Sequence, residues 1–192
     1  IYTYLFVVRV WCVLETDALP ILKLLVKIEF KFLICSWSWA IIFCSILADQ
    51  YTKIIAVEHL SYHEPVAVLP FLNFFLTYNE GAAFSFLSEA GGWQRWFLIV
   101  ISVAICLAIV NFLRQLDTKH TIQRIGLVIL LSGAIGNLID RIRNGYVIDF
   151  IQIYYENWYW PTFNIADSLI TIGVVILATD ILIFEKRRVN DS

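Results

Sequence analysis

Two aspartates in the C-terminal half of the chain, Asp149 and Asp167, have the setting of a catalytic carboxyl pair. Asp149 lies in YVIDFI between apolar residues, and the nearest lysine or arginine in sequence is Arg143. Asp167 follows Asn-Ile-Ala and begins a long apolar run. Two carboxyl groups in a partly desolvated site share one proton, so one activates water while the other protonates a carbonyl oxygen. This chemistry is the minimum required for aspartyl peptide hydrolysis.

Asp167 also has a simpler alternative role at the start of the last predicted helix. A carboxylate at a helix N-terminus accepts backbone N–H bonds and stabilises the positive end of the helix dipole. Asn164, three residues earlier, could take the same capping position. The residues alone leave both assignments open.

Further polar residues gather where predicted helices end. Asp49 and Lys53 close the first apolar run four residues apart, which places them on one helical face as a candidate ion pair. Asn137, Asp140 and Arg141 close the third run. We predict a structural pairing of Asp140 with Arg141, because the adjacent cation should keep the carboxyl ionised. Anchoring of helix ends is an equally weighted alternative role for these charged residues.

Other chemistries have little support in the residue pattern. His59 and His63 are four residues apart, but there is no HExxH order and no evident third ligand, so we interpret them as surface histidines. No GxSxG or Walker-type glycine loop occurs. We interpret the cysteines as apolar side chains rather than metal ligands or disulfide partners: Cys12, Cys35, Cys44 and Cys106. We expect no metal and no organic cofactor.

The composition places these residues in a membrane protein. Of 192 residues, 60% are hydrophobic and 16% are charged, above the apolar content of a typical soluble domain. The net charge of -2 gives no basic surplus for a nucleic-acid partner. Four apolar runs are each close to the ~20 residues that cross a bilayer. The sequence therefore predicts an all-α membrane protein with four transmembrane helices, at about 32–48, 93–113, 122–138 and 166–184.

The distribution of lysine and arginine predicts the orientation. One side of the membrane receives Lys23, Lys27, Lys31, Arg114, Lys119, Arg124, Lys186, Arg187 and Arg188, and the other receives Lys53, Arg95, Arg141 and Arg143. Cytoplasmic segments carry the excess of positive residues. Both termini are therefore expected in the cytoplasm, with the segments 49–92 and 142–165 outside.

The two outward segments differ from a simple connector. In the first, VAVLPFLNFFLTYN and AAFSFL are rich in β-branched and aromatic residues, which predicts a small extracytoplasmic β-rich cradle. The second is an aromatic extracytoplasmic loop, with Tyr146, Tyr154, Tyr155, Trp158, Tyr159 and Trp160. These rings fit either a belt at the lipid headgroups or a lid over a groove that faces lipid.

The acidic residues also bear on a rival function. A small transporter or channel would distribute its carboxylates across the depth of the membrane. Here they gather at one side, with only Asp180 deep in the last run. A lipid-binding scaffold without catalysis is a third reading, and a lipidated peptide bound without being cleaved would favour it.

Five short stretches, in this order, carry a resemblance to a known family: DQYTK at 49–53, YNEGAAFS at 78–85, SGAIGNLIDR at 132–141, YVIDF at 146–150 and FNIADS at 163–168. From about residue 32 to 184 the chain resembles the bacterial lipoprotein signal peptidases, signal peptidase II, which are intramembrane aspartyl proteases. Residues 1–31 fall outside the resemblance, and we expect an N-terminal extension there, cytoplasmic or at the membrane surface. The four-helix domain is then 32–186, with a cytoplasmic tail at 187–192.

The resemblance implies an inner-membrane endopeptidase that cleaves prolipoproteins just before a diacylglyceryl-modified cysteine. It implies a catalytic pair of Asp149 and Asp167 near the periplasmic face, with a lipidated prolipoprotein and membrane lipid as partners, and we expect a monomer. Gly81 would allow a tight turn beside Asn79, whose amide could hold the substrate backbone, and Ala166 would leave room for that backbone. The supporting positions that it implies are Asp49, Lys53, Asn79, Gly81, Asn137, Asp140, Arg141, Asn164 and Ala166. With the site placed beside it, the aromatic loop is better interpreted as a lid than as a belt.

Overall fold

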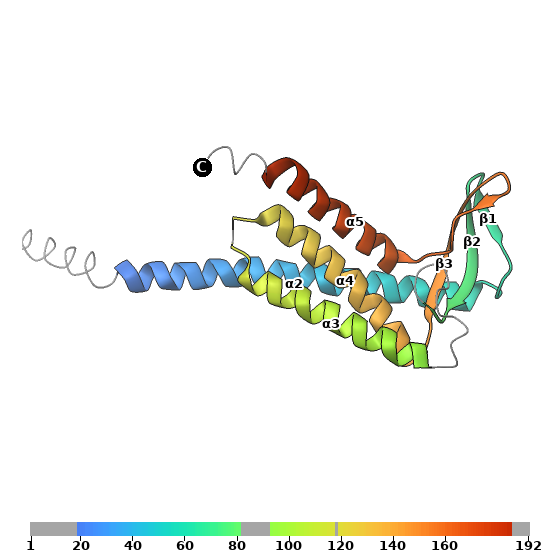
Figure 1. The fold of residues 1–192 in the computed structure, drawn as a ribbon, viewed down its shortest axis with the longest axis horizontal. Helices are drawn as coiled ribbons and strands as arrows, with labels where there is room; N and C mark the ends of the chain where they lie inside the picture. The colour runs from blue at the N-terminus through green and yellow to red at the C-terminus, as the bar shows by residue number, and fades with distance from the viewer. Residues whose placement is uncertain (1–18, 82–92, 118, 186–192) are drawn as a thin grey trace, which may run out of the picture. The chain divides into compact units, whose positions relative to one another are not determined.

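The computed structural model describes residues 19–81, 93–117 and 119–185, with side chains described at 38–81, 93–117 and 119–183. The chain divides into two compact units, Ile1–Trp39 and Ala40–Ser192, and the sheet and the site described below lie in the second. The bounds of the helices and strands are α2 Leu19–His59, β1 Val66–Leu69, β2 Leu72–Asn79, α3 Trp93–Gln115, α4 Thr121–Arg143, β3 Val147–Tyr155, β4 Trp158–Tyr159, α5 Ile165–Thr179 and the π-helical turn η3 Asp180–Glu185. Along the described chain, strands β1 and β2 follow helix α2, and strands β3 and β4 lie between the helices α3 and α4 and the last α-helix, α5 (Figure 1).

Four helical segments are long and apolar enough to cross a membrane: Ser38–His59, Trp93–Gln115, Thr121–Arg143 and Ile165–Ile183. They confirm the four predicted runs, and the first helix continues beyond the predicted end at residue 48. Asp49 and Lys53 therefore do not close α2, which continues through an apolar stretch to His59. A charged pair that is neutralised inside the protein has no need to lie at the end of a helix.

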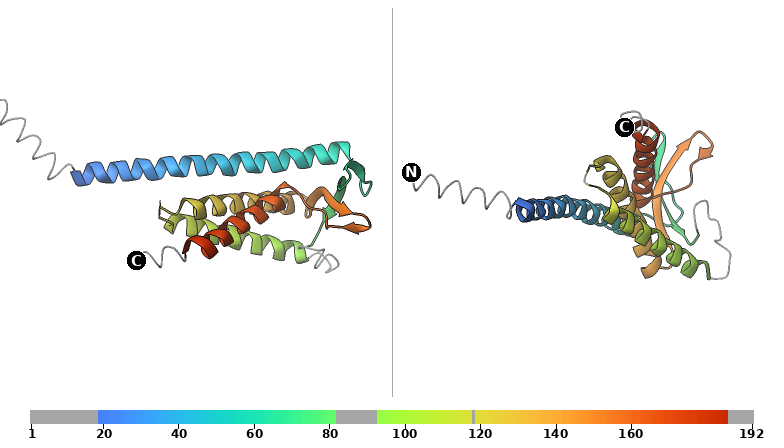
Figure 2. Two further views of the ribbon diagram at one scale, coloured as in Figure 1. Left: turned by 90° about the horizontal axis from the view of Figure 1, so that it is seen from above. Right: turned by 60° about the vertical axis from the view of Figure 1, so that its left-hand side comes forward.

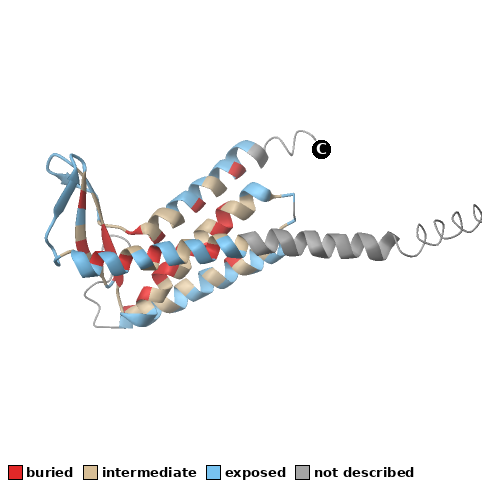
Figure 3. Ribbon diagram, turned by 180° about the vertical axis from the view of Figure 1, so that it is seen from behind, coloured by how far each residue is buried: buried red, intermediate tan, exposed pale blue. Residues whose placement is uncertain are grey.

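The apolar core lies where α2, α3 and α4 meet. It contains Ile42, Ile109, Leu127, Val128 and Leu131, and α4 is the most buried of the four spans (Figure 3). Large apolar side chains are exposed on the outer faces of the helices, among them Phe43, Val100, Leu107 and Val175. A helical bundle with an apolar exterior is suited to lipid rather than water.

Helices α4 and α5 approach closely because small residues line their contact. A Cβ added to Gly133 would collide with the backbone oxygen of Ala166. A Cβ added to Gly136 would lie 2.7 Å from Asp49 Oδ2 and 3.1 Å from the Ala166 Cβ. Small residues at such positions let helix backbones pack tightly in a membrane. This contact holds the start of α5 against α4 at the height of the site.

An antiparallel sheet with strand order β1-β2-β3-β4 lies at one end of the helices (Figure 2). It contains the strands predicted within 66–79, whereas the predicted continuation AAFSFL lies outside the described residues. The segment expected to be an aromatic loop instead forms β3 and β4, so the sheet includes strands from both outward segments rather than from the predicted β-rich cradle alone. The run VIDFIQIYY is rich in β-branched and aromatic residues and pairs with β2, which satisfies its backbone groups.

Candidate active site

Asp149 and Asp167 line the same cavity, which has a volume of about 530 Å³. Asp149 lies on β3 opposite Thr77 of β2, and Asp167 lies in the first turn of α5. The Asp149 side chain is buried, with its residue 2% exposed. The remainder of the wall comes from the segment before β1, from β2, β3, α4 and α5, and from the segment after β4: His63, Thr77, Tyr78, Asn79, Asn137, Arg141, Val147, Trp160, Pro161, Thr162, Phe163, Ile170 and Thr171.

Asn164 touches both carboxyl groups. Its side-chain Nδ2 donates to Asp149 Oδ1 at 2.7 Å, and its backbone N–H donates to Asp167 Oδ2 at 3.2 Å. Its Oδ1 accepts the backbone N–H of Asp167 at 2.9 Å, which fixes the amide with its NH₂ group toward Asp149. Asn164 is therefore the N-cap of α5, and Asp167 completes a capping box from the third helical position. The open capping question is resolved with both residues taking part.

Asn137 of α4 connects this pair to a buried lysine. Its Nδ2 donates to Asp167 Oδ1 at 2.7 Å, while its Oδ1 accepts from Asn164 Nδ2 at 3.1 Å and from Lys53 Nζ at 3.2 Å. An ammonium donates only, so Lys53 determines which end of the Asn137 amide faces Asp167. The amide is thereby oriented to donate to the carboxyl group.

Asn79 contacts Asp149 from the end of β2. Its Nδ2 donates to Asp149 Oδ2 at 3.2 Å, and its Oδ1 accepts the backbone N–H of Gly81 at 3.1 Å. The Arg141 guanidinium donates in turn to the Gly81 carbonyl at 3.4 Å. The Asn79 amide that we expected to hold substrate therefore also holds the Asp149 carboxyl.

The environment of Asp149 raises the pKa of its carboxyl group from 3.8 to about 7. Burial is the largest cause, followed by the charge of Asp167, and both disfavour ionisation. Hydrogen bonds from Asn79 and Asn164 and the charge of Lys53 act in the opposite direction without cancelling the rise. A carboxyl group with this pKa can carry a proton near neutral pH, as an acid–base pair requires.

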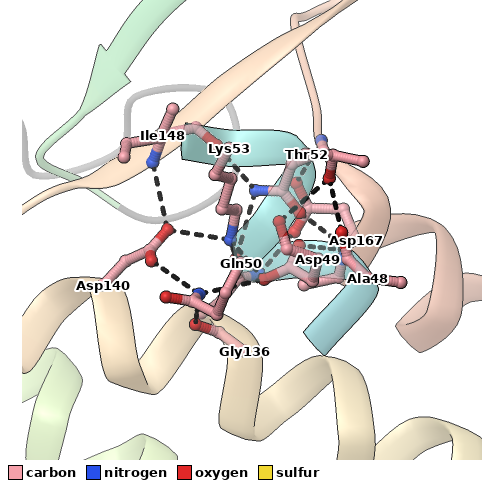
Figure 4. Close-up of polar contacts among 12 residues, drawn as sticks. Ala48, Asp49, Gln50, Thr52, Lys53, Gly136, Asp140, Ile148 and Asp167 are labelled. Atoms are coloured by element: carbon pink, nitrogen blue, oxygen red, sulfur yellow. Dashed lines mark hydrogen bonds and ion pairs between the residues drawn. The ribbon is translucent and has the colours of Figure 1, made fainter. Parts of the chain in front are cut away.

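A buried charge cluster anchors the strands and helices that carry the site (Figure 4). Lys53 Nζ lies 2.8 Å from Asp49 Oδ2 and 2.8 Å from Asp140 Oδ2, and all three residues are at most 2% exposed. Asp49 Oδ1 accepts the backbone N–H of Ala166 at 2.9 Å. Asp140 Oδ2 accepts the backbone N–H of Ile148 at 3.3 Å. The cluster thus fixes the residues adjacent to Asp167 and Asp149 in sequence.

One predicted pairing needs correction, and a second residue gains a structural explanation for its small size. The ion-pair partner of Asp140 is Lys53 rather than Arg141, because consecutive residues of a helix point in different directions. Arg141 lines the cavity instead, and its Nε has no hydrogen-bond partner among the described residues. Ala166 is fully buried against Gly136 and is absent from the described cavity wall. Its small size serves the packing of helices.

Gln50 is a member of the charge cluster that the sequence analysis did not select. Its Nε2 lies 2.9 Å from Asp140 Oδ1, 3.2 Å from Asp49 Oδ2 and 3.3 Å from the Gly136 carbonyl oxygen. Its place in DQYTK, three residues before Lys53, was the signal that could have identified it. Within the described ranges, no three His, Cys, Asp or Glu residues are grouped to hold a metal ion.

Comparison with known proteins supports the resemblance over most of the chain. Residues 41–183 match the family model described as Signal peptidase (SPase) II. The chain belongs to the signal peptidase II family. A lipoprotein signal peptidase of Acinetobacter baumannii is 49% identical over 148 residues, which are 77% of this chain and 84% of that protein. One from Alteromonas mediterranea is 42% identical over 159 residues, 83% of this chain and 84% of that protein.

A solved structure agrees with this membership of the signal peptidase II family. A bacterial membrane enzyme determined by the in meso method at 2.3 Å resolution has a TM-score of 0.70 and 33% sequence identity. The similarity covers 77% of this chain and 88% of that chain. The protein is therefore a protease of lipoprotein processing, with helices able to span a bacterial membrane.

Proposed function

We propose that this chain cleaves the signal peptide of diacylglyceryl-modified prolipoproteins just before the lipidated cysteine, using water activated by Asp149 and Asp167. The observation that carries the proposal is that both carboxyl groups line one cavity and accept hydrogen bonds from one residue, Asn164. Family membership supplies the substrate class.

In the proposed reaction the pair holds a single proton. The ionised carboxylate removes a proton from water as the water oxygen bonds to the scissile carbonyl carbon, and the protonated carboxyl donates to the carbonyl oxygen. The tetrahedral intermediate then collapses: the C–N bond breaks, the amide nitrogen takes a proton from the pair, and a hydroxyl group of the intermediate returns a proton to the pair as the carbonyl re-forms. The products are a new carboxyl terminus and the free amino group of the lipidated cysteine. The two aspartates titrate as one unit, so neither is assigned the proton permanently.

The membrane setting follows from the charge distribution. The excess of positive residues supports a cytoplasmic location of both termini, and on this orientation the sheet and the site lie near the periplasmic face of the inner membrane. The domain occupies 32–186, between an extension at 1–31 and a tail at 187–192. Since one chain supplies every polar contact described for the pair, a monomer suffices.

The segment after β3 is proposed to act as a lid. Trp160, Pro161, Thr162 and Phe163 line the cavity. Backbone hydrogen bonds hold the segment to β3, from Trp160 N to the Ile153 oxygen at 2.8 Å and from Phe163 N to the Ile151 oxygen at 2.9 Å. Aromatic residues at this position can exclude water from the site while the substrate enters from the bilayer.

A cleavage assay on a diacylglyceryl precursor in lipid vesicles tests the proposal. Asp149→Asn and Asp167→Asn should each lower kcat on the order of a thousandfold or more, because an amide can neither accept nor donate the transferred proton. Glu58→Gln is the matched control, since this exposed carboxylate of α2 is not among the described residues that line the cavity. Near-normal turnover by either folded Asn variant would contradict the catalytic assignment.

A further inference from the structure

A second cavity of about 520 Å³ adjoins the catalytic one. The two cavities share Trp160, Phe163, Asp167 and Thr171 in their walls. The second wall adds the apolar side chains of Ile153 on β3, Trp158 on β4 and Ile172 on α5. We call this second cavity the acyl groove. It extends from a catalytic carboxyl group along the outer face of α5.

The hydroxyl and carboxyl groups in the wall of the acyl groove already have hydrogen-bond partners within the protein. Ser168 Oγ donates to the backbone oxygen of Asn164 at 3.0 Å, and Thr171 Oγ1 donates to the backbone oxygen of Asp167 at 2.9 Å. The two Asp167 carboxyl oxygens accept from Asn137 and Asn164. The acyl groove therefore presents mainly hydrocarbon and aromatic surface, with a carboxyl group only where it meets the catalytic cavity.

We propose that the acyl groove holds one acyl chain of the substrate's diacylglyceryl group. This inference rests on the proposed function. The lipidated cysteine directly follows the scissile bond, so its glyceryl group must lie a few bonds from the carbonyl attacked beside Asp167. The shared wall formed by Trp160, Phe163 and Thr171 gives the attached chain a continuous apolar path out of the catalytic cavity.

The substrate's own chain is a better occupant than that of a bulk phospholipid. Lipid tails are as apolar as the groove, so a free lipid gains little by leaving the bilayer for it. A chain tethered to a peptide in the catalytic cavity is delivered at high effective concentration. The main effect of the groove is therefore to position the scissile bond, and its contribution to the affinity for the substrate is small.

Filling the groove with a larger side chain should disfavour substrates with long acyl chains relative to substrates with short ones. Ile172→Trp places a larger side chain in the groove. Val174→Trp is the matched control, because Val174 lies on the same helix outside the groove wall. The two residues have similar exposed fractions, 48% for Ile172 and 50% for Val174. Both variants are assayed on one precursor peptide carrying dipalmitoyl or dibutyryl glyceryl. For Ile172→Trp, the ratio of kcat/KM for the long-chain to the short-chain substrate should fall on the order of tenfold, because misplacement of the reacting carbonyl is costly. Val174→Trp should leave this ratio at the wild-type value.

The groove assignment would be overturned if Ile172→Trp kept the wild-type ratio of kcat/KM for the long-chain to the short-chain substrate. It would also be overturned if both tryptophan variants changed this ratio equally.

Photolabelling distinguishes the acyl chain of the substrate from that of a bulk phospholipid as the occupant of the groove. A precursor with a diazirine at the end of one acyl chain should label Ile153, Trp158 or Ile172, and a phosphatidylcholine with the same chain should label them less. Equal labelling by the phospholipid would refute the tethered occupant. Absence of any precursor cleavage by the wild type would instead refute the proposed function.

Discussion

The Asn164 side chain donates to Asp149 Oδ1 at 2.7 Å while its backbone N–H donates to Asp167 Oδ2 at 3.2 Å. One residue thus sets the position of both proposed catalytic carboxyl groups and caps the helix that carries one of them. These two roles can be separated by mutation.

Asn164→Ser should separate helix capping from orientation of the carboxyl groups. A serine oxygen can still accept the Asp167 backbone N–H but lacks the amide that donates to Asp149. The thermal midpoint should stay near wild type while kcat falls about tenfold to a hundredfold. Asn164→Ala should show the same loss of activity and also lose about 1 kcal/mol of stability with the cap. Wild-type kcat in the serine variant would show that the amide has no orienting role.

The raised pKa of Asp149 predicts how stability depends on pH. The native carboxyl has a pKa of about 7 against an ordinary value of 3.8, so between these values the native state binds the proton more tightly than the unfolded state. Its contribution to stability is complete below the ordinary value and is lost as pH rises through about 7. Asp149→Asn removes this titration. The Tm of the variant relative to wild type should therefore be higher at about pH 8 than at about pH 5.

Asn79→Ala should move the alkaline limb of the pH–activity profile to higher pH. The hydrogen bond from Asn79 lowers the Asp149 pKa, so its loss should raise that pKa further above the ordinary value. Activity requires one shared proton, and the pair would then retain that proton to higher pH. The measurement is kcat against pH, with the exposed Glu58→Gln as the control. A downward shift of the limb would contradict this account of Asp149.

Lys53→Met should be among the most destabilising single changes. It leaves the Asp49 and Asp140 carboxylates buried without their cation, at a cost of about 3–5 kcal/mol. Lys53→Met combined with Asp140→Asn removes one of the two stranded charges and should recover part of this loss. Thermal unfolding in detergent measures both variants. Additive losses in the double variant would show that the two side chains are not coupled.

Gly136→Ala should destabilise the protein more than Gly126→Ala. The added methyl group at Gly136 would meet Asp49 Oδ2 at 2.7 Å, inside the rigid charge cluster. At Gly126 it would meet the Leu177 side chain at 2.9 Å, which can move. Overpacking of this kind costs about 1–3 kcal/mol where neighbours cannot yield. The difference in Tm between the two variants is the measurement, and equal Tm values would argue against a rigid cluster.

The local sequence was sufficient for several features of this protein. Hydrophobicity is a property of each segment, so the four spans could be predicted without knowing their neighbours. The Asp49–Lys53 pair followed from helical spacing within one segment. The short motifs placed Asp149 and Asp167 among the site residues, and both line one cavity.

Other features depended on which surfaces meet in the folded chain. The sequence paired Asp140 with its neighbour Arg141, but the fold brings Lys53 from another helix to 2.8 Å. The segment 142–165 was predicted as a loop, yet it contains β3 and β4 because β2 offers β3 backbone partners. Ala166 was assigned to the substrate, although close approach of α4 accounts for its size.

Gln50 shows the same limit most clearly. In the sequence, Gln50 is an ordinary amide side chain at a predicted helix end. Only the tertiary structure brings Asp49, Asp140 and the Gly136 carbonyl oxygen within hydrogen-bond distance of it. The sequence determined the membrane class, the spans and the candidate carboxyl pair, because each is encoded in a few adjacent residues. The tertiary structure decided the ion-pair partners, the sheet and the adjoining groove, because burial makes a polar group depend on whichever distant residue can satisfy it.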